Sequence, residues 1–414
     1  MHASGFFRFG IVLVALGLCA IPWVPVWGME PPRLTPLAIA PDWSWLDAYQ
    51  GKLRRSELLR ALDEHYAPGG TAAGWIEVGP RAVRVKAGGN TWKEIALAPE
   101  GTATDRGHAR RFWRKAREMG PAPAGRPLQG VRIAIDPGHL GGSWARMEER
   151  YFQMPTGQPV MEGDLTLQVA KKLQPQLEKL GAQVTLLRKS DLPTTRERPE
   201  TLKPAAEADL NGSPTQERIR LHSELFFYRI SEIRARARLV NEQIQPDVVV
   251  CLHLNAEDWG EPESPQLVPR NHFHTLVNGC YGPKELGFDD VRAEMLEHLF
   301  AGTADESVPL SETVAEAVAE ESGLPPFTYF SSNARRVGKG PYVYARNLLA
   351  TRLYRAPVVY LEPYVMNSGP IWRRVQAGDY TGTRSVQGVP TKSLVSEYAA
   401  GVAAGLARYY ADNR

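Results

Sequence analysis

The sequence predicts an α/β protein with a mainly parallel β-sheet and helices on both faces, preceded by a small α+β domain. Short apolar runs alternate with helical stretches from residue 130 onward. This alternation is typical of parallel sheets that are buried on both faces. A stretch rich in proline and glycine, GPAPAGRPLQG at 120–130, separates this region from the part before it. We therefore expect a small domain at 29–125 and a main domain at 130–414.

Composition and charge are those of a globular protein with a sizeable core. Of the 414 residues, 43% are hydrophobic and 23% are charged, and the net charge is +3. A nucleic-acid-binding protein would need a clustered basic face, so we expect no nucleic-acid partner. The three cysteines are too few for a disulfide scaffold. Cys251 and Cys280 are expected either to be free or to form one bridge.

Residues 1–28 have the features of an export signal. Arg8 precedes the apolar run GIVLVALGLCAIPWVPV, and Gly28 offers a small residue for cleavage. The alternative is an uncleaved membrane anchor. We therefore expect an exported protein that resides in the periplasm or the cell envelope.

The small domain is expected to combine one helix with a hairpin. Leucines near helical spacing follow Ser56, and Gly69 and Gly70 are expected to stop the helix. The stretch 74–88 alternates apolar and polar residues around a Gly-Pro turn, and 92–99 could add a third strand. Both a wall-binding role and a purely structural role are consistent with this unit.

The main domain is expected to alternate strands and helices, with two insertions near 189–235 and 257–305. The second insertion is rich in proline, glycine and acidic residues and is expected to be irregular. The first belongs to a stretch, 189–245, that could form a lid or an arm to which a regulatory protein binds. The expected strands are 131–135, 182–188, 246–256 and 356–363. The expected helices are 164–181, a long helical region ending near Gln245, 311–323 with Ser311 as cap and Gly323 as stop, and 392–410.

Three of the buried strands lead into a residue that can bind a metal or transfer a proton. His139, His253 and Glu362 follow these strands, and Glu162 opens the first helix of the main domain. The carboxyl ends of parallel strands meet at one edge of a sheet, where ligands bind. Two imidazoles and one carboxylate form a typical catalytic zinc site with a position left for water. A second carboxylate, for which Glu362 is suited, would transfer the proton.

Each of these residues also has an ordinary interpretation. A single histidine is commonly a hydrogen-bonded loop residue, and Glu162 alone could favour the helix N-terminus as a first-turn acid. Glu362 could form a structural ion pair with Arg346 or Arg352. The occurrence of all four at the ends of elements of one predicted sheet favours a site.

Four motifs in this order resemble the zinc-dependent N-acetylmuramoyl-L-alanine amidases of the Amidase_3 type, over residues 130–410. The motifs are IAIDPGH, EGDLTLQVAKKLQPQLEKLGAQVTLLRKSD, RARLVNEQIQPDVVVCLHLNA and YARNLLATRLYRAPVVYLEPYVMN. The resemblance implies that His139, Glu162 and His253 hold Zn²⁺ and that Glu362 is the catalytic carboxylate. It implies peptidoglycan as substrate and cleavage of the amide between N-acetylmuramic acid and L-alanine. Asn255, His272, His274 and Arg346 are candidates for substrate contacts.

The chain departs from the family pattern around the expected site. The loop after His139 is LGGSWARMEERYFQMPTGQPVM, which makes Glu148 and Glu149 rival metal ligands. Pro363 and Tyr364 stand where the family usually has Gly-Phe. A zinc hydrolase of another amide or peptide, or a cell-wall-binding protein without catalysis, therefore stays as an alternative.

Overall fold

A computed structural model of the protein describes residues 31–102 and 110–414. The predicted export signal at 1–28 lies outside the described residues. Among the described residues, no helix has both the length and the apolar character that crossing a membrane requires.

A seven-stranded sheet forms the centre of the molecule and confirms the predicted fold class. Its strand order is β10-β11-β9-β12-β8-β4-β7. The strands β7, β4, β8 and β12 run parallel to one another, whereas β9 is antiparallel to β12 and β10 is antiparallel to β11. The strands are β4 Arg132–Pro137, β7 Gln183–Leu186, β8 Val248–Leu252, β9 His274–Val277, β10 Ala334–Arg336, β11 Val343–Arg346 and β12 Val358–Glu362.

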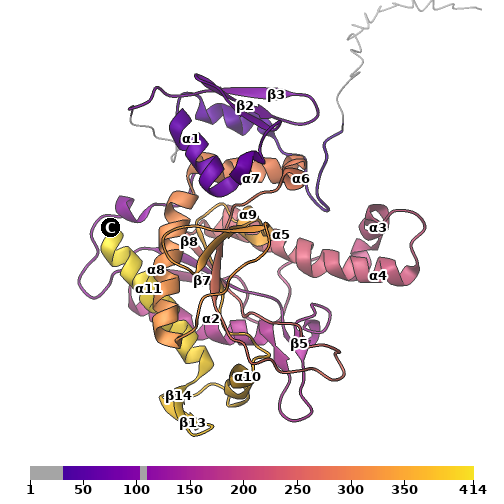
Figure 1. The fold of residues 1–414 in the computed structure, drawn as a ribbon, viewed down its shortest axis with the longest axis vertical. Helices are drawn as coiled ribbons and strands as arrows, with labels where there is room; N and C mark the ends of the chain where they lie inside the picture. Colours follow the sequence, from indigo (N-terminus) through magenta and orange to yellow (C-terminus); the bar gives the residue numbers. More distant parts are fainter. Residues whose placement is uncertain (1–30, 103–109) are drawn as a thin grey trace, which may run out of the picture.

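Helices cover both faces of the sheet because alternate strand residues point to opposite sides. Ile133 and Ile135 of β4 face α2 (Glu162–Lys179), α8 (Ala304–Ser322) and α11 (Leu394–Asn413). Ala134, between them, faces the other layer, which includes η7 (Leu239–Ile244) and α9 (Leu349–Leu353). In Figure 1, α8 and α11 run side by side along the sheet.

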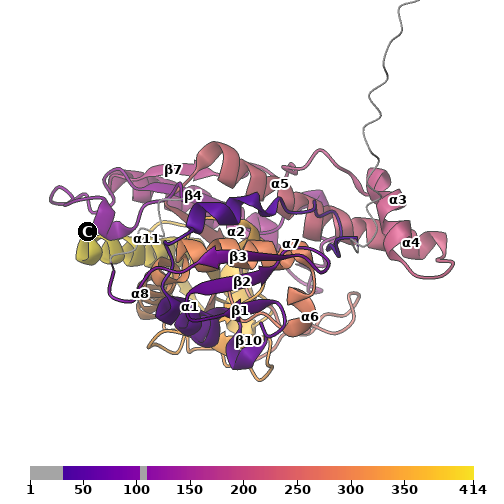
Figure 2. The same ribbon diagram turned by 90° about the horizontal axis from the view of Figure 1, so that it is seen from above.

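A continuous helical region leads from the surface into the core. It consists of α4 (Gln216–Leu225), η6 (Phe226–Ser231), α5 (Glu232–Arg238) and η7. It ends at Gln245, whose φ of 48° is left-handed, close to the predicted end. The helix α3 (Pro199–Asp209) packs on α4, and Figures 1 and 2 show this α3–α4 arm projecting from the body.

Two expectations about the main domain need correction, and one open alternative is decided. The segment 257–305 is not irregular throughout, because it contains β9, α6 (Pro283–Leu286) and α7 (Asp289–Ala301). Ser311 is not a helix cap, because α8 begins at Ala304 and continues through Pro309. Cys251 and Cys280 are both buried free thiols, which decides between the two alternatives for them.

The N-terminal elements pack on the main domain through α7. The predicted hairpin and third strand are confirmed as β1 (Ile76–Val78), β2 (Ala82–Lys86) and β3 (Trp92–Ala96), beside α1 (Arg55–Ala61). These elements share one apolar cluster with α7, and Figures 1 and 2 show them stacked against that helix. Because α7 is buried on nearly all sides, it lacks the one-sided apolar stripe by which a surface helix is recognised. Side chains of the shared cluster include Leu46, Tyr49, Val83, Val85, Ile95, Val291, Met295, Leu299 and Phe300.

Two buried histidines at this junction predict a loss of stability in acid. His65 contacts the Asn278 carbonyl at 2.6 Å and His298 contacts the Arg352 carbonyl at 2.8 Å. Burial lowers the pKa of each imidazole from 6.5 to about 4. The unfolded chain therefore binds more protons between these two pH values, and stability falls as the pH drops from 6.5 towards 4.

Each of these histidines is expected to contribute up to about 3 kcal/mol to this acid destabilisation. The measurement is the free energy of unfolding of the wild-type chain and of His298→Gln at pH 7.5, 5.5 and 4.5. The variant keeps an amide donor for the Arg352 carbonyl but cannot be protonated, so its stability should fall less over this range. Equal pH dependence of the two proteins would contradict this account of His298.

Candidate metal centre

The loop after β4 is built so that His139 stands at the edge of the sheet. Gly138 is required there because a Cβ at this position would overlap the His253 ring. His139 itself has a left-handed φ of 58°, which turns the chain sharply at the end of the strand. Arg236 donates hydrogen bonds to the carbonyls of Pro137, at 2.9 Å, and His139, at 3.2 Å. The backbone on both sides of Gly138 is therefore fixed by a buried guanidinium.

The hydrogen bonds of Asp136 explain why a carboxylate precedes the Pro-Gly-His sequence. It is buried and accepts hydrogen bonds from Arg236, at 2.7 Å, and from the Tyr354 hydroxyl. Arg236 also pairs with Glu232 at 2.8 Å, and Arg188 donates to the carbonyls of Pro137 and Gly138. Sequence reasoning missed the roles of Asp136 and these two arginines. The available signals were an acid at the end of an apolar strand and the arginine that opens the RARLVNE motif.

Removal of the Arg236 guanidinium is expected to destabilise the fold strongly. Arg236→Met leaves the buried carboxylates of Asp136 and Glu232 without the cation that pairs with both, which typically costs about 3–5 kcal/mol of unfolding free energy. Arg238→Met on the same helix changes an exposed side chain and should shift stability by less than about 0.5 kcal/mol. Denaturant unfolding of both variants measures the difference. Equal stability of the two would show that the network around Asp136 is not needed to hold the loop.

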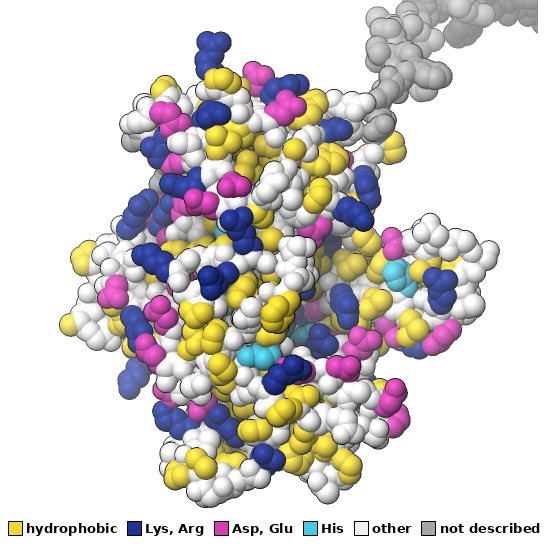
Figure 3. Space-filling view, in the orientation of Figure 1, with side chains coloured by type: hydrophobic (Ala, Val, Ile, Leu, Met, Phe, Trp, Pro, Cys, Tyr) yellow, Lys and Arg dark blue, Asp and Glu magenta, His cyan; other side chains and the backbone are white. Residues whose placement is uncertain are grey.

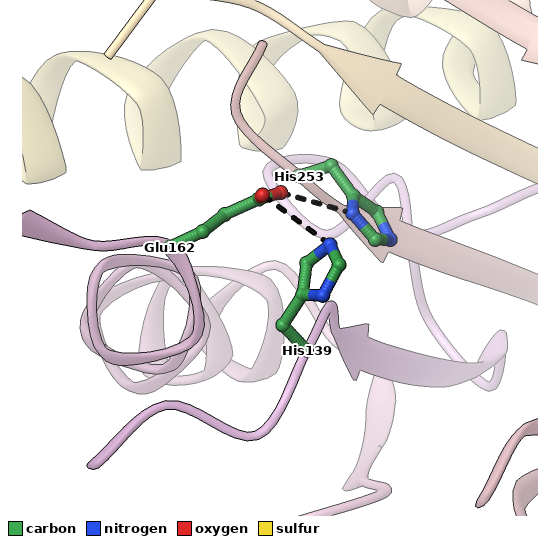
Figure 4. Close-up of side chains that lie close together, drawn as sticks. All are labelled: His139, Glu162 and His253. Carbon is green, nitrogen blue, oxygen red and sulfur yellow. Dashed lines mark hydrogen bonds and ion pairs between the residues drawn. The ribbon is translucent and has the colours of Figure 1, made fainter. Parts of the chain in front are cut away.

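His139, Glu162 and His253 converge as the sequence predicted (Figure 4). Their ligand atoms lie within 4.8 Å of one another. Glu162 lies between the two rings, with Oε2 3.2 Å from His139 Nε2 and Oε1 3.1 Å from His253 Nδ1. The three come from the loop after β4, the first residue of α2 and the end of β8. Two imidazoles and a carboxylate are a combination of donors that metal sites use, including catalytic zinc sites.

The surroundings keep Glu162 ionised and hold His253 in place. Burial opposes ionisation of Glu162, but His139, His253 and Arg150 lower the pKa of its carboxyl to about 2. Burial works against protonation of His253, but contact with Glu162 outweighs it and raises the pKa of the imidazole. The His253 ring stacks on Tyr360, with ring centroids 4.4 Å apart. The ligand atoms are thus fixed from the strand side as well as from the helix side.

Glu362 ends β12 and lines the same cavity as the three candidate ligands. Burial raises the pKa of its carboxyl to about 7, with a further upward contribution from the negative charge of Glu162. Neither of the two arginines considered as an ion-pair partner of Glu362 forms an ion pair with it in the structure; each has another partner. Arg352 pairs with Glu294, and Arg346 donates to the Tyr329 hydroxyl at 3.2 Å. Glu362 is therefore a carboxyl poised to exchange protons near neutral pH.

The cavity has a volume of about 670 Å³ and opens between the body and the base of the arm. Figure 3 shows the surface hollowed between these two parts. Besides the four residues above, its lining includes Arg150, Tyr228, Arg229, Asn255, Glu257 and Trp259. A cavity of this size with convergent polar groups fits a substrate site.

One of the four candidates for substrate contact lies in this lining and three lie beside it. Asn255 is a lining residue, whereas His272, His274 and Arg346 are not. His274 stands directly opposite Glu362 in the antiparallel β12–β9 pair, and its Nε2 lies 2.9 Å from the Tyr329 hydroxyl. His272 lies 3.4 Å from a carboxylate oxygen of Glu257. Contact of these four candidate residues with substrate stays a prediction.

The rival ligands Glu148 and Glu149 lie outside the convergent group. Glu149 is 70% exposed and pairs with Arg229 at 3.2 Å. Glu148 is buried and accepts hydrogen bonds from the backbone amides of Leu140 and Gly141, while one oxygen lies 3.6 Å from His139 Nδ1. The directions of their side chains therefore place neither residue in the group formed by His139, Glu162 and His253.

A protein-family model described as N-acetylmuramoyl-L-alanine amidase matches residues 133–368. No curated protein matches the chain. Among solved structures, the N-acetylmuramyl-L-alanine amidase Ami1 of Mycobacterium smegmatis is 16% identical, with a TM-score of 0.38, and covers 69% of this chain and 99% of its own. The amidase AmiC2 of Nostoc punctiforme is 16% identical, with a TM-score of 0.37, and covers 68% of this chain and 98% of its own. Because these identities and TM-scores are low, only the match to the family model assigns the chain to a family.

Proposed function

Because the family model matches more than half of its length, this chain belongs to the N-acetylmuramoyl-L-alanine amidase family, and we propose that it is an exported zinc amidase of peptidoglycan. Its reaction would be hydrolysis of the amide between N-acetylmuramic acid and the L-alanine of the stem peptide. The observation that carries the proposal is the convergence of His139, Glu162 and His253 beside Glu362 in one cavity.

The residues of the site fit zinc rather than a harder cation. Calcium and magnesium prefer oxygen ligands, whereas zinc accepts imidazole nitrogen together with a carboxylate. Three protein ligands are the number found in catalytic zinc sites, which keep a position for water or substrate. A zinc ion held by these residues would act as a Lewis acid on the substrate carbonyl and would make water a usable nucleophile at neutral pH.

Glu362 would carry the proton through the reaction. As a carboxylate it takes a proton from the attacking water, and as an acid it returns that proton to the leaving amine of L-alanine when the C–N bond breaks. A pKa near 7 allows both steps at neutral pH. Arg150 also lines the cavity, with Nε 3.1 Å from Glu162, and adds positive charge beside that carboxylate. Tyr360 and the loop held by Arg236 keep the two imidazoles oriented.

Digestion of purified peptidoglycan tests this proposal. The wild-type chain is expected to release stem peptides that begin with a free L-alanine amine, as identified by mass spectrometry. A chelator should stop the release and added zinc should restore it. If zinc is bound and no new stem peptides appear, the amidase proposal fails and a wall-binding function is favoured. Cleavage at another bond would favour a different zinc hydrolase.

Export follows as part of the same proposal, because peptidoglycan lies outside the cytoplasmic membrane. The predicted signal at 1–28 supports a location in the periplasm or the cell envelope. Cell fractionation would test it, and accumulation of the chain in the cytoplasm would contradict it.

The α3–α4 arm is proposed to control access to the site and to offer a surface for a regulatory protein. The residues at its base, Tyr228 and Arg229 of η6, line the cavity, so the arm and the site are directly connected. Replacing residues 206–219 at the tip with a Gly-Ser linker should lower kcat/KM several-fold while zinc content stays unchanged. Peptidoglycan turnover and metal analysis measure both quantities. A variant that loses its zinc together with its fold would contradict this assignment.

A further inference from the structure

Glu148 is a buried carboxylate beside His139 that the proposed mechanism does not use. It lies in the loop between β4 and α2 and is only 3% exposed. A buried carboxylate is retained only where hydrogen bonds or charges compensate for the loss of water. The partners of Glu148 therefore indicate what it does.

Its first partners are two backbone amides that the left-handed turn at His139 directs inward. Glu148 accepts from Leu140 N at 2.9 Å and from Gly141 N at 3.3 Å. Gly141 continues the turn with a φ of 77°. A carboxylate that binds successive amides in this way fixes the conformation of the loop that carries His139.

Its third partner is the imidazole of His139, on the side that faces away from the metal site. Nδ1 of His139 lies 3.6 Å from Glu148, whereas Nε2 lies 3.2 Å from Glu162. A carboxylate beside Nδ1 favours the tautomer that carries its proton there, which leaves the Nε2 lone pair free for a metal.

We propose that Glu148 is a positioning residue of the zinc site, which fixes the loop, the ring orientation and the tautomer of His139. The inference rests on the zinc site of the proposed function, but not on which bond the protein cleaves. Loss of such an outer-shell partner typically weakens metal binding about 10–100-fold, although no ligand is removed.

Glu148→Gln tests the assignment, with Glu149→Gln as the matched control. The glutamine oxygen can still accept from the backbone amides, but its amide NH2 group is a donor and cannot accept a hydrogen bond from Nδ1–H of His139. Glu149 is the neighbouring residue and points to solvent. Zinc affinity is measured by competition with a chelator, and thermal unfolding of the zinc-free proteins reports on the fold.

We expect zinc to bind about 10–100-fold more weakly to Glu148→Gln, while Glu149→Gln matches the wild type. The zinc-free proteins should unfold at similar temperatures, and Glu148→Asp, which keeps the charge, should recover part of the affinity. Wild-type zinc affinity in Glu148→Gln would overturn the assignment, as would a wild-type chain that binds no zinc. A lower unfolding temperature of zinc-free Glu148→Gln would assign Glu148 a purely structural role instead. A chain that shows this dependence but cleaves no peptidoglycan would contradict only the amidase proposal.

Discussion

Glu362→Gln is expected to lower kcat on peptidoglycan by about 10²–10⁴-fold, the range that a general acid–base contributes. Glutamine has nearly the same shape but can neither take a proton from water nor deliver one to the leaving amine. Because Glu362 is not among the three candidate ligands, the variant should bind zinc as the wild type does. Release of stem peptides measures the rate, and metal analysis measures the zinc content.

Glu257→Gln is the control for this experiment. Glu257 lines the same cavity, but its carboxylate pairs with the exposed side chain of Arg270, which is not a lining residue. The control should retain most of the activity. If Glu362→Gln is as active as Glu257→Gln, the proton transfer assigned to Glu362 is wrong, and another group must protonate the leaving amine.

His253→Ala is expected to lose both zinc and activity. The change removes one of three ligands and also the ring that stacks on Tyr360. Its effect on zinc affinity should exceed the roughly 10–100-fold that outer-shell changes cost. Zinc content after dialysis and peptidoglycan turnover are the two measurements.

His272→Ala serves as the matched control, because His272 is a buried histidine close to the cavity but outside the convergent group. It should keep its zinc. Loss of zinc from His272→Ala, or its retention in His253→Ala, would show that the metal is held elsewhere.

The parts of the fold that the sequence predicted are those with a local signal. The strands β4, β8 and β12 are short, continuous apolar runs, and α2 has a leucine stripe that ends near Gly181. The convergence of His139, His253 and Glu162 followed from these elements, because the ends of parallel strands share an edge of the sheet. For such a site, correct strands and their direction are sufficient to bring distant residues together.

The parts that the sequence did not predict depend on tertiary contacts. The strand β9 is only four residues long and antiparallel to its neighbour β12, and α7 is buried on nearly all sides. In neither element do buried residues alternate with exposed ones at the period of 2 or 3.6 residues by which a strand or a helix is recognised in a sequence. Glu148 and Glu149 are adjacent and chemically identical in the sequence, yet one faces His139 and the other faces solvent. Only the conformation of the loop distinguishes them.

Anomalous diffraction at the zinc edge, from crystals grown with zinc, tests the central claim most directly. We expect one strong peak between His139 Nε2, Glu162 and His253 Nδ1, with Glu362 beside it but not bound. A peak at any other group of residues, or no peak at these three side chains, would contradict the metal centre and the chemistry assigned to it.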